Sequence, residues 1–194
     1  MKEPFDKYYN EYDLWFEENN DIYTEELNFI KKHINTHKKG IEIGVGTGRF
    51  AIPLNIKYGI EPSLNMAKIA FQRGIKVIIG KAEQIPIKDN SFDFVLLNTV
   101  ICFFDNLKES FKEIGRILKK NGYLYIFFID KDTTLGKIYE EKKSKNRFYK
   151  YAHFFSKEEV EDISKDYFFI ISIKTLLINN IEGMRLLTLK KIKE

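Results

Sequence analysis

Short apolar runs separated by amphipathic stretches dominate the chain from Gly40 onward. Five runs are apolar at successive positions, as expected of strands buried on both faces: residues 41–45, 58–60, 76–79, 92–97 and 123–129. Between these runs, residues 63–73 and 107–119 have the spacing of amphipathic helices. Strands that alternate with helices in this way predict an α/β fold, in which helices cover both faces of a mostly parallel sheet.

The two ends of the chain have different patterns. Residues 3–37 predict two helical segments, the first of them rich in aromatic side chains. Ser156 and Glu159 form a capping-box pair, which predicts a helix that continues to about Lys165. Residues 167–177 and 184–189 then predict an antiparallel hairpin at the edge of the sheet. Residues 131–155 are charged and rich in tyrosine, and we expect them to form an insert or lid outside the sheet.

Length and composition favour one globular domain. The 194 residues are 44% hydrophobic and carry a formal net charge of +4, in which Lys is interleaved with acidic residues, so an acidic partner is only weakly indicated. Cys102 is the single cysteine, so the chain can form no internal disulfide. The first residues lack the pattern of a secretory signal, and the most apolar window, residues 94–104, is too short to span a membrane. We therefore expect a cytoplasmic protein without a membrane partner.

A glycine-rich turn follows the first predicted strand. Gly44, Gly46 and Gly48 alternate with other residues, and the segment is expected to open a helix. A dinucleotide fingerprint would place its third glycine at position 49, and no P-loop lysine follows the turn. Glu42 is poorly suited to a phosphate but suits a cationic ligand. S-adenosylmethionine, which carries a sulfonium and an ammonium but no phosphate, fits this pattern, whereas NAD does not.

The order of the motifs resembles class I S-adenosylmethionine-dependent methyltransferases, in particular the ubiquinone/menaquinone biosynthesis type (methyltransferase type 11). Glu42-x-Gly44-x-Gly46-x-Gly48 is similar to the first motif of that family. Further similarities lie in residues 58–66, which contain an acidic-x-Ser-x-x-Met pattern, and in residues 80–87, 90–95 and 113–124. The resemblance covers residues 40–129 and extends weakly to residues 5–16.

This resemblance implies a Rossmann-like, seven-stranded fold, S-adenosylmethionine as the cofactor, and a defined set of cofactor-binding residues. These residues are Glu42, Gly44, Gly46, Gly48, Glu61, Pro62, Met66, Ala82, Glu83 and Asn98. In this family Glu61 would accept hydrogen bonds from both ribose hydroxyls, Met66 would pack near the adenine, and Ala82 and Glu83 would border the adenine edge. Lys81 departs from the usual Asp or Asn, which leaves the adenine amino group to backbone amides or to Glu83.

The resemblance also suggests how a single domain of residues 1–194 is divided. We expect an N-terminal helical lid (residues 1–37), a cofactor-binding core (38–130), an insert or lid on the acceptor side (131–155), and a C-terminal helix with a β-hairpin (156–194).

The pattern singles out no general base, and none is required, because methyl transfer from a sulfonium depends mainly on positioning and desolvation. His153 and Tyr12 are weak candidates for a catalytic role. The expected acceptor pocket contains Tyr12, Tyr139, Tyr149 and Tyr151, and the lysines of the insert would suit a planar or anionic acceptor. Cys102 is interpreted as a buried, inert thiol. His33 and His37 lack a third ligand, so no metal site is expected.

Three functions therefore remain in view, led by methyl transfer to a small molecule. A nucleic-acid or protein methyltransferase is the first alternative, although residues 98–101 do not match the Asn/Asp-Pro-Pro-Tyr/Phe motif of amino-directed nucleic-acid enzymes. The second alternative is a non-catalytic protein that only binds S-adenosylmethionine or S-adenosylhomocysteine. The sequence leaves open the acceptor, the atom that is methylated, the use of a general base and the oligomeric state.

Overall fold

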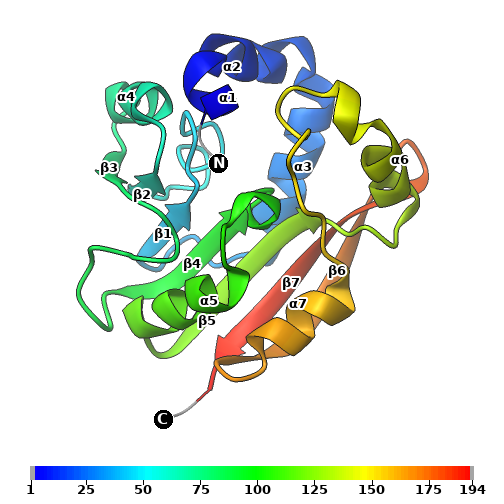
Figure 1. Cartoon of the computed structure of the whole chain (residues 1–194). Helices are drawn as coiled ribbons and strands as arrows, with labels where there is room; N and C mark the ends of the chain where they lie inside the picture. The colour runs from blue at the N-terminus through cyan, green and yellow to red at the C-terminus, as the bar shows by residue number, and fades with distance from the viewer. Residues whose placement is uncertain (1–2, 193–194) are drawn as a thin grey trace.

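A seven-stranded sheet in the order β3-β2-β1-β4-β5-β7-β6 forms the centre of the computed structural model, which describes residues 3–192 (Figure 1). The strands are β1 (Gly40–Ile43), β2 (Tyr58–Glu61), β3 (Lys76–Ile79), β4 (Phe92–Asn98), β5 (Leu118–Ile129), β6 (Phe168–Ile178) and β7 (Ile181–Lys191). Strands β1 to β5 are parallel, and β7 pairs antiparallel with both β5 and β6. The predicted α/β fold with a C-terminal antiparallel hairpin is confirmed. Because the strand order reverses between β1 and β4, a crevice is expected at their carboxyl ends.

Helices cover both faces of the sheet, as the doubly apolar strands required. They are α1 (Glu3–Lys7), α2 (Tyr9–Glu18), α3 (Asn20–His33), α4 (Leu64–Gln72), α5 (Leu107–Ile117), α6 (Thr134–Lys142) and α7 (Lys157–Ser164), with short 3-10 turns η1 (Ile101–Phe103) and η2 (Lys143–Lys145). Along β4, Leu96 packs in one buried cluster with Ile30 of α3, whereas Leu97 packs in the other with Phe111 of α5. Helices α5 and α7 lie together on one side of the sheet (Figure 1).

The glycine-rich turn does not open a helix, so that prediction is wrong. Residues 44–55 form successive turns instead. Pro53 has no backbone N–H and cannot donate to the carbonyl of Arg49, as a helix would require. That carbonyl instead accepts a hydrogen bond from the Tyr23 hydroxyl at 2.6 Å. Asn55 then adopts a left-handed conformation (φ 56°), which ends the turns before β2.

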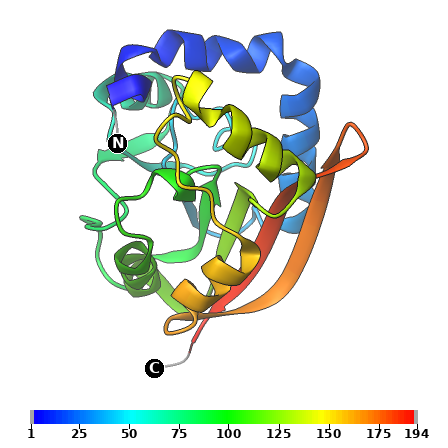
Figure 2. The ribbon, with the colours of Figure 1, turned by 45° about the vertical axis from the view of Figure 1, so that its right-hand side comes forward.

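The N-terminal helices and the segment that carries α6 lie side by side over the carboxyl ends of the strands (Figure 2). Residues 3–33 form three helices, whereas the sequence predicted two segments. Arg147, after η2, forms a 2.8 Å ion pair with Glu11 of α2, which joins the two covers. Asp6 of α1 accepts a hydrogen bond from the Ser63 hydroxyl at 2.7 Å. Residues 1–2 of the expected lid and 193–194 of the expected C-terminal part lie outside the described residues.

None of the helices in residues 3–192 combines the length and the apolar character that a membrane-spanning helix needs.

Candidate functional site

The turn after β1 can exist only with glycine at its first position. Gly44 has a positive φ of 73°, and a Cβ there would lie 2.3 Å from Cγ2 of Val100. The backbone N–H groups of Gly44 and Val45 both donate to the carbonyl of Ile60, at 2.8 and 3.0 Å. Gly46 follows with a φ of 55° and lines the cavity described below. The turn therefore brings backbone, rather than side chains, to the cavity.

Gly48 serves packing and does not line the cavity. Its φ is 84°, and a Cβ would lie 2.6 Å from Cδ1 of Ile75, which follows α4. Glycine is therefore required at Gly46 and Gly48 for different reasons, access to the cavity and close packing, and the spacing in the sequence does not distinguish these reasons. The predicted cofactor contact of Gly48 has no support from its position.

Glu61 joins the turn after β1 to the turn after β2. One carboxylate oxygen accepts a hydrogen bond from the Gly46 N–H at 2.9 Å, and the other accepts one from the Ser63 N–H at 2.9 Å. Burial raises the pKa of Glu61, although these two backbone donors partly oppose that effect. Each oxygen retains a further lone pair, and Glu61 lines the cavity, so the carboxylate can accept additional hydroxyl donors.

Three buried polar atoms in or beside the turn have no hydrogen-bond partner in the described part of the chain: Oε2 of Glu42, Oγ1 of Thr47 and Oδ1 of Asn98. A buried acceptor left unpaired costs about 1–3 kcal/mol, so each would gain from a ligand that supplies a donor. Burial first, and then the nearby charge of Glu61, raise the pKa of Glu42 well above its ordinary value. Of these residues, Asn98 lines the cavity, so its Oδ1 can accept a hydrogen bond from a ligand donor such as the ammonium group of S-adenosylmethionine.

A cavity of about 800 Å³ opens above the carboxyl ends of β1, β2 and β4. It lies within the volume range of small-molecule sites, and at the crevice that the strand order creates. The predicted site residues that line it are Tyr12, Gly44, Gly46, Glu61, Pro62, Met66, Ala82, Glu83, Asn98, Tyr139 and Tyr149. Four predicted residues, Glu42, Gly48, Tyr151 and His153, are not among its lining residues.

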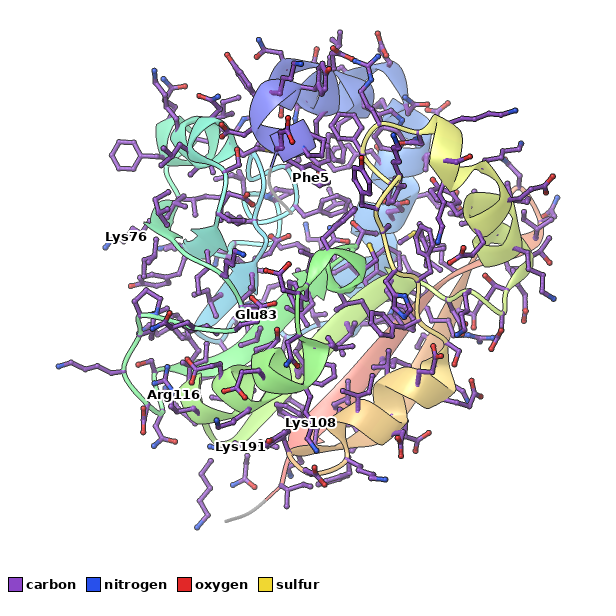
Figure 3. The ribbon with its side chains drawn as sticks, in the orientation of Figure 1. Phe5, Lys76, Glu83, Lys108, Arg116 and Lys191 are labelled. Carbon is purple, nitrogen blue, oxygen red and sulfur yellow. The ribbon has the colours of Figure 1, made fainter. Side chains whose placement is uncertain are left out.

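Residues after β3 form one wall of the cavity and are held by neighbouring groups. Oε1 of Glu83 accepts hydrogen bonds from the N–H groups of Asp105 and Asn106, at 2.8 and 3.2 Å. Lys81 donates to the Asp105 carboxylate at 2.6 Å. Lys81, which replaces the Asp or Asn usual in the family, therefore forms an ion pair with Asp105 on this wall. In Figure 3, Glu83 comes from this wall, whereas Phe5, which also lines the cavity, comes from the helices above.

Aromatic rings form the opposite wall. Tyr12 of α2 lies next to the glycine-rich turn, because a Cβ on Gly46 would lie 3.6 Å from its hydroxyl. Its ring packs edge-on against Phe5 and Phe16, at centroid distances of 5.8 and 5.2 Å. Burial, followed by the charges of Glu61 and Glu42, raises the pKa of Tyr12, so the phenol stays protonated near neutral pH. Tyr12 is thus suited to donate a hydrogen bond and to exclude water.

Comparisons with known proteins agree with this geometry. A family model described as a methyltransferase domain matches residues 41–126. The crystal structure of an S-adenosylmethionine-dependent methyltransferase from Thermotoga maritima, described as a possible histamine N-methyltransferase, is 41% identical, covers 100% of both chains and has a TM-score of 0.90. The chain belongs to the S-adenosylmethionine-dependent methyltransferases. The resemblance, the cofactor and the enzymatic character inferred from the sequence are confirmed.

Two relatives complete the comparison. An uncharacterized protein of Methanocaldococcus jannaschii is 54% identical over 162 residues, which are 84% of this methyltransferase and 78% of that protein. A demethylmenaquinone methyltransferase of Geobacillus kaustophilus is 27% identical over 120 residues, 55% of this chain and 51% of that protein. The second alignment spans only about half of each protein.

The insert of this methyltransferase supplies two of the four tyrosines predicted for the acceptor pocket. Tyr139 of α6 packs edge-on against Tyr149 at a centroid distance of 5.2 Å, and Tyr149 packs on Phe103 at 5.6 Å. Burial raises the pKa of both phenols. Tyr151 is 63% exposed and lies outside this group. Burial also raises the pKa of the Cys102 thiol, in agreement with its interpretation as inert.

The structure does not bring His153 to the cavity of the methyltransferase. Its side chain is exposed and lines a separate depression beside Asp162 and Lys165. Its backbone N–H donates to the carbonyl of Cys102 at 2.9 Å, which fixes the chain path and turns the ring toward Phe155. The suggested catalytic role of His153 therefore has no support from its position.

Sequence reasoning missed Glu26 on α3. This residue lines the cavity and forms no hydrogen bond or ion pair with the rest of residues 3–192. Burial first, and then the charge of Glu25, raise the pKa of Glu26 to about 8. The available signal was its spacing, four residues after Ile22 and four before Ile30, which places an acid on the apolar stripe of a predicted helix.

Proposed function

We propose that this methyltransferase transfers a methyl group to a small-molecule acceptor bound in the aromatic part of the cavity. The observation that carries the proposal is the continuity of the cavity, which runs from the glycine-rich turn past Tyr12 to a wall built from α3 and α6. A volume of about 800 Å³ has room for the cofactor and a second small molecule.

The cover over the cavity also supports a small acceptor. Glu11 of α2 and Arg147 of the insert close its upper edge with hydrogen bonds of 3.0 and 2.8 Å. Among the insert lysines, Lys143 is engaged with Glu140 at 2.7 Å. A macromolecular acceptor would have to displace this cover, which makes nucleic acid a poor partner for this site.

Each residue of the site has a distinct task in the proposed reaction. S-adenosylmethionine supplies a methyl group that is already activated by its sulfonium. Glu61 is placed to accept hydroxyl donors, and the unpaired Oδ1 of Asn98, which lines the cavity, can accept a hydrogen bond from the ammonium group of the ligand. Tyr12 and its aromatic neighbours exclude water, so the main contribution of the protein is positioning and desolvation.

A methyl-transfer screen tests the proposal. The purified protein is incubated with labelled S-adenosylmethionine and, in separate reactions, with a cell extract fraction of small metabolites, with total RNA and with total protein. We expect label in the small-molecule fraction alone. Label that appears in RNA or protein instead would overturn the proposed acceptor class. Calorimetric titration with S-adenosylmethionine, S-adenosylhomocysteine and NAD checks the cofactor in parallel.

A further inference from the structure

Glu26 is an ionisable group inside the cavity that the cofactor motifs do not use. It lies on α3 and lines the cavity, as do Ile22, Leu135 and Tyr139. The side chain is partly accessible from within the cavity, while the surrounding protein shields it from bulk solvent. An enclosed carboxylate without a partner is costly, so its position calls for a ligand that compensates the charge.

The protein itself does not supply a counterion to Glu26. Three basic residues line the cavity in the described part of the chain, Lys81, Lys145 and Arg147, and none pairs with Glu26. Lys81 is bound to Asp105, and Arg147 is bound to Glu11. None of these three residues is paired with Glu26, so a cation that enters the cavity can bind to it.

Aromatic rings surround the space that faces Glu26. The charge of Glu26 acts on the phenols of Tyr12, Tyr139 and Tyr149, which come from α2, from α6 and from the segment after η2. The rings of Tyr149, Phe103 and Phe5 follow one another at centroid distances of 5.6 and 4.9 Å. Rings of this kind attract an ammonium group through their π faces and provide apolar contact for its carbon body.

Tyr12 connects this region to the cofactor site. Its hydroxyl lies beside the Gly46 turn, and both Glu61 and Glu26 influence its pKa. A ligand nitrogen bound by Glu26 would thus lie on the same side of the cavity as the group that delivers the methyl. We propose that Glu26 binds the nitrogen of the acceptor, and that the acceptor is a small protonated amine with an aromatic or apolar body.

This inference rests on the proposed function and accounts for a proton that the reaction must move. A protonated amine has no lone pair, so one N–H proton passes to the Glu26 carboxylate and leaves a neutral amine. The nitrogen lone pair then forms the new N–C bond while the S–C bond breaks, and the sulfur keeps that electron pair. The product nitrogen carries the positive charge, and Glu26 returns its proton to solvent when the product leaves. With a pKa of about 8, Glu26 is largely protonated near neutral pH in the protein alone. A bound ammonium favours the ionised carboxylate, which can then accept the amine proton.

The test compares amines with a neutral compound of the same shape. Calorimetry measures the binding of 2-phenylethylamine, histamine and tryptamine, with 2-phenylethanol as the uncharged match, to protein saturated with S-adenosylhomocysteine. We expect the wild type to bind at least one amine about 10-fold or more tightly than the alcohol, because a hydrogen bond to a charged group is strong in an enclosed site. Glu26→Gln should lose that preference, while its affinity for S-adenosylmethionine stays unchanged.

A matched control separates Glu26 from the general charge of α3. Glu25→Gln removes the same charge from the adjacent, exposed position and should keep the amine preference. The inference is overturned if no amine binds the wild type, if amine and alcohol bind equally, or if Glu26→Gln keeps the preference. Failure of the wild type to bind S-adenosylmethionine would instead refute the proposed function. If the wild type binds the cofactor but the methyl-transfer screen labels only neutral acceptors, the role of Glu26 alone is refuted.

Discussion

Arg73, the residue that follows α4, donates two hydrogen bonds of 2.7 Å to the Asp13 carboxylate on α2. Arg49, in the turns after β1, donates to the same carboxylate at 2.9 and 2.7 Å. Burial of Asp13 opposes its ionisation, but the hydrogen bonds from both arginines outweigh burial and hold its pKa well below the ordinary value. One carboxylate therefore fastens the helical cover both to α4 and to the glycine-rich segment.

Asp13→Asn should loosen this cover. The variant leaves two partly buried guanidinium groups without their counterion, so we expect a loss of about 1–3 kcal/mol in the free energy of unfolding at pH 7. Because the folded-state pKa of Asp13 is depressed, its contribution is present above the ordinary value of 3.8 and is lost as pH falls below it. Urea unfolding at pH 7 and pH 3 measures both effects, with the exposed Asp21→Asn as the control. Equal stability of the two variants at pH 7 would contradict the role of Asp13.

Much of the sheet follows from local pattern, because a strand buried on both faces must be apolar at successive positions. Strand β4, which is largely buried, begins at Phe92 as the sequence predicts and ends at Asn98, one residue beyond the predicted end. Ser156 and Glu159 form the predicted capping box, with hydrogen bonds in both directions. Local physics decided these features, so they were visible without any tertiary information.

The departures occur where distant residues meet. Pro53 prevents the helix that the glycine-rich motif suggested, and the carbonyl it leaves free is bound by Tyr23 from another helix. His153 was chosen for its residue type, but packing leaves it exposed. Glu26 faces the cavity only because α3 and α6, far apart in sequence, both line it. No local pattern encodes such a juxtaposition.

Glu61 should be essential for cofactor binding. Glu61→Ala removes the acceptor of the Gly46 and Ser63 N–H groups and the acceptor offered to the cavity, so we expect an affinity for S-adenosylmethionine at least about 30-fold weaker. Glu61→Gln keeps the shape of the side chain but supplies only one acceptor oxygen, so its affinity for S-adenosylmethionine should lie between those of the wild type and Glu61→Ala. Calorimetric titration measures the affinities, and circular dichroism verifies that each variant is folded. Wild-type affinity in Glu61→Ala would refute the site.

Gly46 and Gly48 should respond differently to the same substitution. Gly46→Ala places a methyl group in ordinary van der Waals contact with Tyr12 and Met66, so we expect a loss of only about 1 kcal/mol in stability from the positive φ but markedly weaker cofactor binding. Gly48→Ala drives a methyl group against Ile75, so stability should fall by about 2–4 kcal/mol. The larger Gly46→Arg should abolish turnover. Thermal unfolding with and without S-adenosylmethionine distinguishes the two positions, and identical behaviour would argue against separate roles.

Glu26 should lower the stability of the wild type as pH rises. Its folded-state pKa of about 8 lies above the ordinary value of 4.5, so the folded protein holds a proton that the unfolded chain has already released. Stability therefore falls between pH 4.5 and 8 and levels off above that range. The groups that face Glu26 are Glu25 on its own helix and the phenols of Tyr12, Tyr139 and Tyr149, and those phenols remain neutral throughout this interval.

Glu26→Gln should remove this pH dependence, because the amide has the same shape and cannot ionise. At pH 8 we expect the variant to be more stable than the wild type by about 2–4 kcal/mol, with almost no difference at pH 4.5. Thermal unfolding across this range measures the effect. Glu25→Gln, the exposed control, keeps Glu26 and should therefore retain most of the pH dependence of the wild type. A residue that faces a cavity and destabilises the folded protein is typical of a binding site. If Glu26→Gln were instead less stable than the wild type at pH 8, the carboxylate would have a structural partner, and this interpretation would be wrong.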